Sequence, residues 1–332
     1  MAPDIYLVGL RINGIVAGIS SLLLNSLFLY MVSCQSRGVL ENYKTFFFIH
    51  NAIDFLFTLI AMCTRLIFVV EDHNILNVTL GLASSFGNSI AQYFLLAQVT
   101  MFLLAIIIIP CTYVYRYFLI CRDYQLSQRQ IASMFGVVLF LLGIFFGSLT
   151  FCLAKADENA AIFRRSIHNV LGIDENATFG FFGGRVNSDN FSTFDPQQLC
   201  AIVSSLYIAS AYAIVIFCSY KIIQRLRKVK ESLSRTTRSL QRQLTIALLV
   251  QSLVPCFLYI IPIIILIICG VAGLNIGMAM PVLSGFLEWI PVCNPAITLL
   301  CVRTYRDGLF KMLTFKSIKI SVLSSTSPAV LH

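Results

Sequence analysis

A few ionisable side chains stand inside long apolar stretches of this chain, where a charge is costly. Asp54, Arg65, Arg116 and Glu288 are each flanked mainly by hydrophobic residues. Ionisable residues within membrane spans usually face the protein interior and indicate a functional site. A carboxylate accepts several hydrogen bonds and a guanidinium donates five, so these groups are suited to anchoring a ligand or holding helices together.

The composition excludes several classes of protein. Of the 332 residues, 58 % are hydrophobic and 12 % charged, whereas about 25 % are charged in a soluble domain. The mean hydropathy of +0.84 indicates an integral membrane protein with several spans. The net charge of +9 comes from basic residues in short loops, so we expect no nucleic-acid partner. The sequence has no metal-ligand motif, no nucleophile arrangement and no phosphate-binding glycine loop, so we expect no enzyme, cofactor or metal.

The cysteines predict no disulfide framework. Nearly all of the 11 cysteines lie inside apolar runs. In such surroundings a cysteine behaves as a small hydrophobic residue.

The apolar stretches predict an all-α membrane protein, a bundle of seven transmembrane helices. About 20 apolar residues are enough to cross a bilayer. Pro110 predicts a bend in the third span, which ends at Arg116-Tyr117. An amphipathic helix at 305–315 completes the receptor domain at 1–315, and a short cytoplasmic tail follows at 316–332. The predicted spans are 6–31, 44–70, 93–117, 131–152, 199–220, 243–269 and 278–301.

The distribution of basic residues predicts an amino terminus outside and a carboxyl terminus inside. Cytoplasmic loops are enriched in Lys and Arg. In this orientation most of the 24 basic residues lie inside. The N-glycosylation sequons at Asn77, Asn176 and Asn190 then all lie on the lumenal side, which is where glycans are added. The basic residues on the outer side are Arg11, Arg65, Lys155, Arg164, Arg165 and Arg185.

The basic residues at the predicted inner ends of the spans have two possible interpretations. Arg116 either extends to lipid headgroups or faces a cavity between helices as part of a signalling switch. The segment from Lys221 to Arg242 contains a single acid, Glu231, and binds either anionic lipid or an acidic protein partner. Its basic residues in the predicted coupling surface are Arg225, Arg227, Lys228, Lys230, Arg235, Arg238 and Arg242.

The order of polar residues along the spans resembles that of rhodopsin-like G-protein-coupled receptors. Asn25, Asp54 and Arg116 occupy the first three spans, and Pro255 and Asn294-Pro295 the last two. More specifically, Tyr115-Arg116-Tyr117, the segment 234–255 and the closing Tyr305-Arg306 resemble nematode serpentine chemoreceptors. The delta class resembles the chain most, with the str class a near second. The resemblance covers most of the chain.

Several positions depart from the rhodopsin-like pattern. Tyr115 replaces the acid before the third-span arginine, so no adjacent salt bridge holds Arg116. Thr298 replaces the tyrosine of the seventh-span motif, and Leu253 replaces a tryptophan before Pro255. No cysteine lies near Ala91, so the usual disulfide to the second outer loop cannot form there. Ala105 replaces a polar ligand for sodium, which leaves open whether Asp54 binds sodium, is hydrogen-bonded or is protonated.

Three functions compete on the sequence. The resemblance implies a receptor that binds an environmental chemical, an odorant or pheromone, and activates a heterotrimeric G protein. It also implies a plasma-membrane location, such as the ciliary membrane of chemosensory neurons. The alternative is a transporter or channel for a small solute, but seven spans do not divide into two equal repeats. A light receptor needs a lysine six residues before Asn294, where this chain has Glu288.

The resemblance and the polar residues together predict two sites. We expect a ligand pocket among the outer halves of spans two, three, six and seven, with a few polar residues in apolar walls. The alternative is that Arg65 extends outward and that neighbours on its own helix provide the hydrogen bonds of Glu288. The switch and coupling site comprises the basic inner segment together with Asp54, Arg116, Pro255, Asn294 and Pro295. The ligand candidates are Arg65, Gln92, Gln98 and Glu288.

Overall fold

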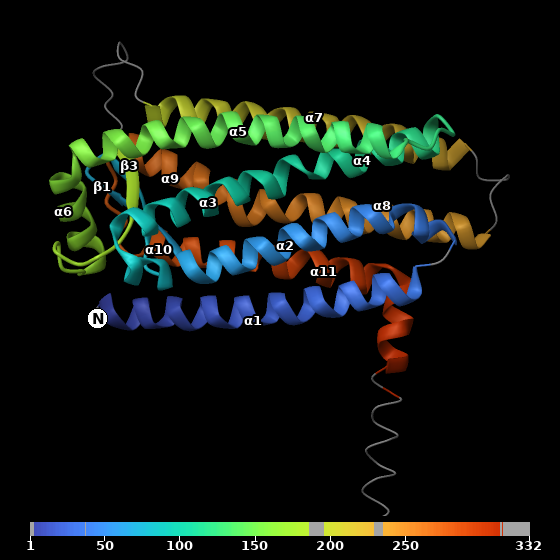
Figure 1. The fold of residues 1–332 in the computed structure, drawn as a ribbon, viewed down its shortest axis with the longest axis horizontal. Coiled ribbons are helices and arrows are strands. Elements are labelled where there is room, and N and C mark those ends of the chain that lie inside the picture. Colours follow the sequence, from blue (N-terminus) through green and yellow to red (C-terminus); the bar gives the residue numbers. More distant parts are fainter. Residues whose placement is uncertain (1–2, 37, 186–195, 229–234, 313, 315–332) are drawn as a thin grey trace, which may run out of the picture.

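The computed structural model describes residues 3–36, 38–185, 196–228, 235–312 and 314. Within this part of the chain, seven helices are long and apolar enough to cross a bilayer, which confirms the predicted number of spans. They lie side by side in one elongated bundle (Figure 1). They are α1 (Pro3–Gln35), α2 (Lys44–Thr64), α3 with α4 (Asn88–Ile107, Ile109–Cys121), α5 (Gln128–Glu158), α7 (Pro196–Lys228), α8 with α9 (Arg235–Pro255, Ile261–Val271) and α10 with α11 (Ala279–Ser284, Ile290–Cys301).

The exposure of apolar side chains agrees with a bundle that is surrounded by lipid. α5 and α7 present large apolar side chains outward, and Phe151 is 72 % exposed. Lipid tails are as apolar as these side chains, so their exposure carries no hydrophobic penalty in a membrane. The third span, α3 with α4, is the most buried of the seven and lies between the others (Figure 1).

The third span is interrupted at Ile108, where α3 ends and α4 begins. Pro110 is the second residue of α4. Its ring nitrogen has no hydrogen to donate to a carbonyl of the preceding turn. The interruption therefore lies where the sequence predicts a bend.

The second span is shorter than predicted. α2 ends at Thr64, and Arg65 adopts a positive φ of 48° while its N–H donates to the Ala61 carbonyl at 2.8 Å. The predicted end of the span, 66–70, instead belongs to strand β1 (Leu66–Glu71). The all-α prediction is wrong in this region, because a buried apolar run fits a strand as well as a helix.

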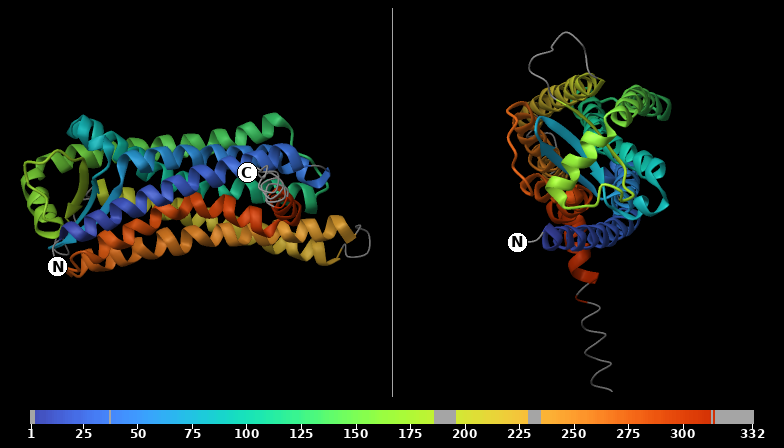
Figure 2. Two further views of the ribbon diagram at one scale, coloured as in Figure 1. Left: turned by 90° about the horizontal axis from the view of Figure 1, so that it is seen from below. Right: turned by 90° about the vertical axis from the view of Figure 1, so that its left-hand side faces the viewer.

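An antiparallel sheet of order β1-β2-β3 lies at the predicted outer end of the bundle. β1 pairs with β2 (Asn74–Thr79), which pairs with β3 (Phe181–Arg185). His73, in the turn between β1 and β2, contacts the Gly270 carbonyl through Nδ1 at 3.1 Å and so joins the sheet to α9. The sheet and helix α6 (Ala160–Leu171) lie across this end of the bundle (Figure 2).

The sixth span changes its helical geometry directly after Pro255. A π-helical turn, Cys256–Ile260, separates α8 from α9. π-turns within α-helices often occur at functional sites. The predicted boundary between spans six and seven at 270–275 agrees with the end of α9, and the seventh span contains a 3₁₀ turn at Gly285–Trp289.

At the end predicted to face the cytoplasm, called the inner end below, two helices are longer than the predicted spans. α7 continues to Lys228 and α8 begins at Arg235, so much of the predicted basic loop is helical. Residues 303–312 form a helix that runs across the bundle axis (Figure 1). Its Tyr305 is buried against the bundle, whereas its Phe310 is exposed. The predicted tail lies outside the described residues.

Candidate functional site

Arg116 on α4 is fully buried and bonded to the sixth span. Its Nη2 donates to Gln241 Oε1 at 3.1 Å, to the Gln241 carbonyl at 3.2 Å and to Thr245 Oγ1 at 3.0 Å. Gln241 and Thr245 lie one turn apart on α8, so they face the same side of that helix. Of the two interpretations of Arg116, this placement agrees with an arginine that faces neighbouring helices.

An aromatic ring also lies beside the same guanidinium. Its Cζ lies 5.6 Å from the centre of the Tyr43 ring, at the start of α2. Tyr115, which replaces the acid, donates its hydroxyl to the Asn42 carbonyl at 2.9 Å. Arg116 Nε and Nη1 make no hydrogen bond among the described residues. Buried donors without acceptors are costly, so groups that offer acceptors can compete for this arginine.

Asp54 belongs to a polar layer that joins the first, second and seventh spans. Asn294 Nδ2 on α11 donates to Asp54 Oδ1 at 2.9 Å. Asn51 Nδ2 on α2 donates to Asn25 Oδ1 at 2.9 Å, and Asn25 Nδ2 on α1 donates to the Pro291 carbonyl at 3.1 Å. The structure therefore brings together the polar residues that the resemblance singled out in these three spans.

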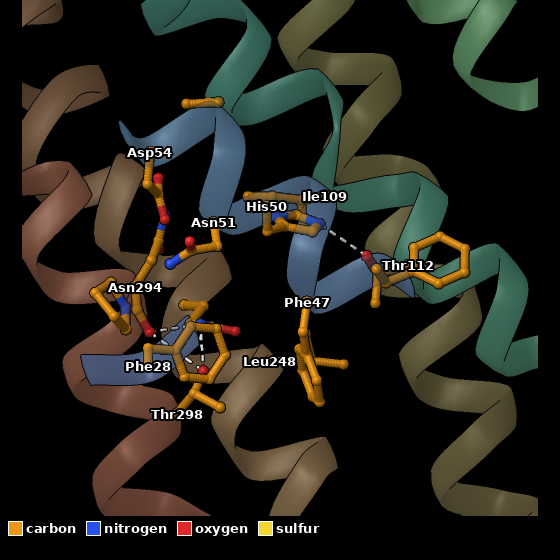
Figure 3. Close-up of a pocket in the computed structure, with 14 residues that line it drawn as sticks. Phe28, Phe47, His50, Asn51, Asp54, Ile109, Thr112, Leu248, Asn294 and Thr298 are labelled. Carbon is orange, nitrogen blue, oxygen red and sulfur yellow. Dashed lines mark hydrogen bonds between the residues drawn. The ribbon is translucent and has the colours of Figure 1, made fainter. Parts of the chain in front are cut away.

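A small cavity of about 40 Å³ lies between this layer and the third and sixth spans (Figure 3). Gln251 Nε2 on α8 donates to the Asn294 carbonyl and to Thr298 Oγ1, both at 2.8 Å. His50 Nε2 on α2 lies 2.9 Å from Thr112 Oγ1 on α4. A single water needs about 10–15 Å³ measured in this way, so the cavity has room for a few waters. These contacts connect the Asp54 layer to the span that holds Arg116.

A larger cleft of about 600 Å³ opens between the inner ends of α7 and α8. It is lined by Arg227, Arg238 and Arg242, together with Thr245 and apolar residues. Because Thr245 also accepts a hydrogen bond from Arg116, the cleft adjoins the buried arginine. Among the other predicted coupling residues, Arg225 forms an exposed ion pair with Asp123, Lys228 is exposed, and Lys230 and the Arg235 side chain lie outside the described residues.

At the opposite, predicted outer end, a mostly apolar cavity of about 400 Å³, called the outer cavity below, lies between α3, α5, α7, α9 and the sheet. Alternate strand residues face it, including the cross-strand neighbours Phe68, Asn77 and Phe182. Tyr259, in the π-helical turn, lines the cavity and stacks on Phe102 of α3 with ring centres 5.2 Å apart. The cavity thus contacts the point where the sixth span changes geometry.

The family model described as serpentine type 7TM GPCR chemoreceptor Str matches residues 11–310. This chain belongs to that family. The chain is 31 % identical over 157 residues to serpentine receptor class delta-3 of Caenorhabditis elegans, a match that covers 45 % of this chain and 45 % of the relative. The resemblance to nematode serpentine chemoreceptors is confirmed.

The fold of this Str-family chain is similar to that of squid rhodopsin in its crystal structure. The TM-score is 0.63 at 13 % sequence identity, and the alignment covers 94 % of this chain and 81 % of the rhodopsin chain. At this identity the likeness shows the fold alone. The chain is accordingly a multi-pass membrane protein with the helical bundle of a G-protein-coupled receptor.

The four predicted ligand residues of this Str-family receptor do not meet in one cavity. Glu288 accepts a hydrogen bond from Asn13 Nδ2 of α1 at 3.2 Å. Arg65 is half-buried just beyond α2. The pKa of its guanidinium is lowered, mainly by burial, although the charge of Glu288 opposes this shift. Gln98 is buried in α3, with no donor to its Oε1 among the described residues. None of these three, nor the half-buried Gln92, lines the outer cavity.

The sequons differ in their surroundings. Asn77 lies in the central strand and lines the outer cavity, and the hydroxyl of Thr79 donates to the Thr64 carbonyl. Asn176 is exposed in a turn, which leaves room for a glycan. Asn190 lies outside the described residues.

Sequence reasoning missed two partners of the buried arginine in this receptor. The predicted switch does not include Gln241 and Thr245, because both are uncharged and lie among charged residues. A spacing of four residues places both side chains on one helix face, and this spacing is the sequence signal that could identify them as partners of one group. The outer cavity gave no such sign, because its walls come from segments that are far apart in the sequence.

Proposed function

We propose that this Str-family receptor binds a small environmental chemical, an odorant or pheromone, and activates a heterotrimeric G protein. The observation that carries the proposal is the position of Arg116. Neutral acceptors on the sixth span hold it, directly beside a basic cleft. Such a contact can separate without leaving a carboxylate buried alone, so it suits a switch between two helix arrangements.

The ligand site that we propose is the outer cavity beneath the sheet. Its volume of about 400 Å³ lies within the usual range for small-molecule sites, about 300–1,000 Å³. Its walls are mostly apolar, and Asn77 and Ser204 are among its few polar residues. This chemistry fits a small, mostly apolar molecule with one or two hydrogen-bonding groups. The four residues predicted from the sequence then act indirectly or hold the helices together.

Ligand binding and coupling meet in the sixth span. A ligand in the cavity touches Tyr259 in the π-helical turn, next to Pro255. Proline removes a backbone hydrogen bond, so this turn is a natural hinge. An outward swing of α8 about the hinge moves Gln241 and Thr245 away from Arg116. A ligand that binds the open arrangement about 100-fold more tightly shifts the ratio of the two arrangements about 100-fold.

The G protein, in this proposal, enters the widened cleft between α7 and α8. Arg116 there regains acceptors for its Nε and Nη1, and Arg227, Arg238 and Arg242 meet acidic groups of the partner. A planar guanidinium with several donors fits backbone carbonyls and carboxylates better than an ammonium does. Anionic lipid is the competing partner for these basic residues. A substitution of Arg116 distinguishes the two partners, because in this proposal only the G protein contacts Arg116.

The decisive experiment replaces Arg116 by lysine, which keeps the charge but loses the planar set of donors. We expect G-protein activation to fall at least about 10-fold while surface level and ligand binding are kept. Arg122→Lys is the matched control, because Arg122 is an exposed residue at the end of α4. Normal activation by Arg116→Lys would contradict the switch.

Receptor and transporter activity are separated in the same membranes. Nucleotide exchange on the G protein is measured beside ion current and solute uptake, with the odorant mixture that gives the strongest response. Receptor function predicts exchange without current or uptake. Current or uptake without exchange would contradict the receptor assignment.

We also propose the orientation with the amino terminus outside, in the plasma membrane and, in chemosensory neurons, the ciliary membrane. The support is the concentration of basic residues on α7 and α8 at the opposite end from Asn176. Glycosidase treatment of the expressed receptor should shift its mobility, and Asn176→Gln should reduce the shift. A shift that persists unchanged when Asn77, Asn176 and Asn190 are all replaced by glutamine would contradict this orientation.

A further inference from the structure

Two cysteine side chains meet beside the outer cavity. Cys152 lies towards the outer end of α5 and Cys200 in the first turns of α7, and their Sγ atoms are 3.1 Å apart. Both side chains are buried, at 2 % and 7 % exposed. Cys200 Sγ also lies 3.3 Å from Ser148 Oγ, one turn before Cys152. Among the described cysteines no other pair of sulfur atoms makes such a contact.

We propose that Cys152 and Cys200 form a disulfide bond in the mature receptor. A disulfide has an S–S distance of about 2.05 Å, so the two sulfurs need to approach by about 1 Å. The two thiols release two protons and two electrons as the bond forms. The electrons pass to the disulfide of a thiol–disulfide exchange protein of the secretory compartment, which leaves as a dithiol.

The location of the pair makes this chemistry available, provided that the proposed orientation holds. The pair then lies at the lumenal ends of the fourth and fifth spans, and secretory compartments are oxidising. Cys121, at the inner end of the third span, then faces the reducing cytosol. The same residue type thus has different chemistry at the two ends of the bundle.

The bond has two structural consequences. It links the outer ends of α5 and α7, which apolar packing alone holds weakly because lipid solvates the separated helices equally well. It also closes the chain segment 153–199, which contains α6 and strand β3. Closing a long loop reduces the freedom of the unfolded chain. Because both cysteines line the outer cavity, the link fixes one wall of the proposed ligand site.

Peptide mapping of the wild-type receptor tests the bond directly. The full-length protein is expressed in insect cells, alkylated with N-ethylmaleimide without reductant, digested and analysed by mass spectrometry. We expect a peptide pair joined through Cys152 and Cys200 that separates on reduction. Alkylation of both thiols before reduction, or a link to a different cysteine, would overturn the proposal. If Asn176 is glycosylated but both thiols are alkylated, only the disulfide is wrong. If Asn176 carries no glycan either, the proposed orientation loses that support as well.

Thermal unfolding in detergent gives a second measurement. Dithiothreitol should lower the midpoint of the wild-type receptor by about 5 °C or more, and should have no effect on the Cys152→Ser/Cys200→Ser double variant. Cys269→Ser is the matched control, because Cys269 is equally buried near the outer end of α9. It should keep the wild-type response to reductant. An equal effect of dithiothreitol on the double variant and the wild type would contradict the bond. If the double variant does not fold, the peptide mapping of the wild type decides.

Discussion

The two ends of the bundle are held together by different kinds of contact. At the inner end, Arg116 joins the third and sixth spans through three hydrogen bonds to Gln241 and Thr245. At the outer end, a sheet covers an apolar cavity, and its strands are joined by backbone hydrogen bonds. Side-chain bonds separate one at a time, whereas strands in a packed sheet separate together. We therefore propose that the inner end moves and that the outer end keeps its shape.

The sixth span reaches both ends, so we propose that it carries the signal between them. Tyr259 contacts the cavity, and Gln241 contacts Arg116, and the π-helical turn and Pro255 lie between them. In this proposal, a change in the cavity would reach Arg116 through a single span. Each of the following substitutions alters one end of the bundle and tests the contacts described for that end.

The largest effect is expected from Gly183→Val in strand β3. A Cβ at this position would collide with the Ile75 carbonyl oxygen and come within 2.9 Å of Leu76 Cα. Valine favours strands, so a defect would come from this collision rather than from propensity. We expect surface expression to be almost abolished, measured by flow cytometry. Gly136→Val, where nothing lies within 4 Å, should be expressed normally, and normal expression of Gly183→Val would contradict a closely packed sheet.

The next effect tests whether the outer cavity binds the ligand. Ser204→Trp places a large ring in the cavity, whereas Ser205→Trp, one residue further, places it on an exposed face of α7. We expect the odorant concentration for half-maximal response to rise at least about 10-fold for Ser204→Trp, because the ring occupies the ligand's volume. Ser205→Trp should respond normally. Equal responses of the two variants would remove this cavity from the ligand site.

A moderate effect is expected at the inner end from Gln241→Leu. The change removes the Oε1 acceptor of Arg116, and a hydrogen bond to a charged group contributes about 1.5–3 kcal/mol. The open arrangement should gain population, so basal nucleotide exchange should rise several-fold without ligand. Gln243→Leu is the control, since its amide contacts Ser239 and the Arg303 N–H instead. Unchanged basal exchange in Gln241→Leu would show that this contact does not hold the closed arrangement.

The smallest effect is expected from Tyr305→Phe beside the inner end. The Tyr305 hydroxyl lies 2.7 Å from Ser36 Oγ, and burial raises the pKa of Tyr305 to about 12, against a smaller lowering by the Ser36 bond. Phenylalanine keeps the ring contacts with Phe28 and Phe47 and loses only the hydroxyl bond. The melting midpoint should fall by about 2–4 °C, for a loss of about 1 kcal/mol. An unchanged midpoint would contradict a stabilising hydrogen bond between Tyr305 and Ser36.

The number of spans followed from the sequence, because burial in a bilayer requires about 20 consecutive apolar residues whatever their partners are. The sequence also singled out Arg116, Asp54 and Asn294, since charged and amide groups in apolar runs need internal partners. In the structure Asp54 and Asn294 bond each other and Arg116 is buried, as residues in need of partners should be. Their roles in signalling remain proposals.

The partners and the shapes were decided only by the tertiary structure. The run Leu66–Val70 is apolar throughout, and burial on both faces leaves no period to separate a strand from the end of a helix. Hydropathy identifies Gln241 as a polar residue but not as the acceptor of a guanidinium from another span. In the sequence, Cys152 and Cys200 are simply two positions in apolar runs. The packing of α5 on α7 brings their sulfur atoms together. Hydropathy along the sequence indicates which segments lie in the bilayer. The chemistry of a side chain depends on the atoms that it contacts, and only the packing of distant segments determines those contacts.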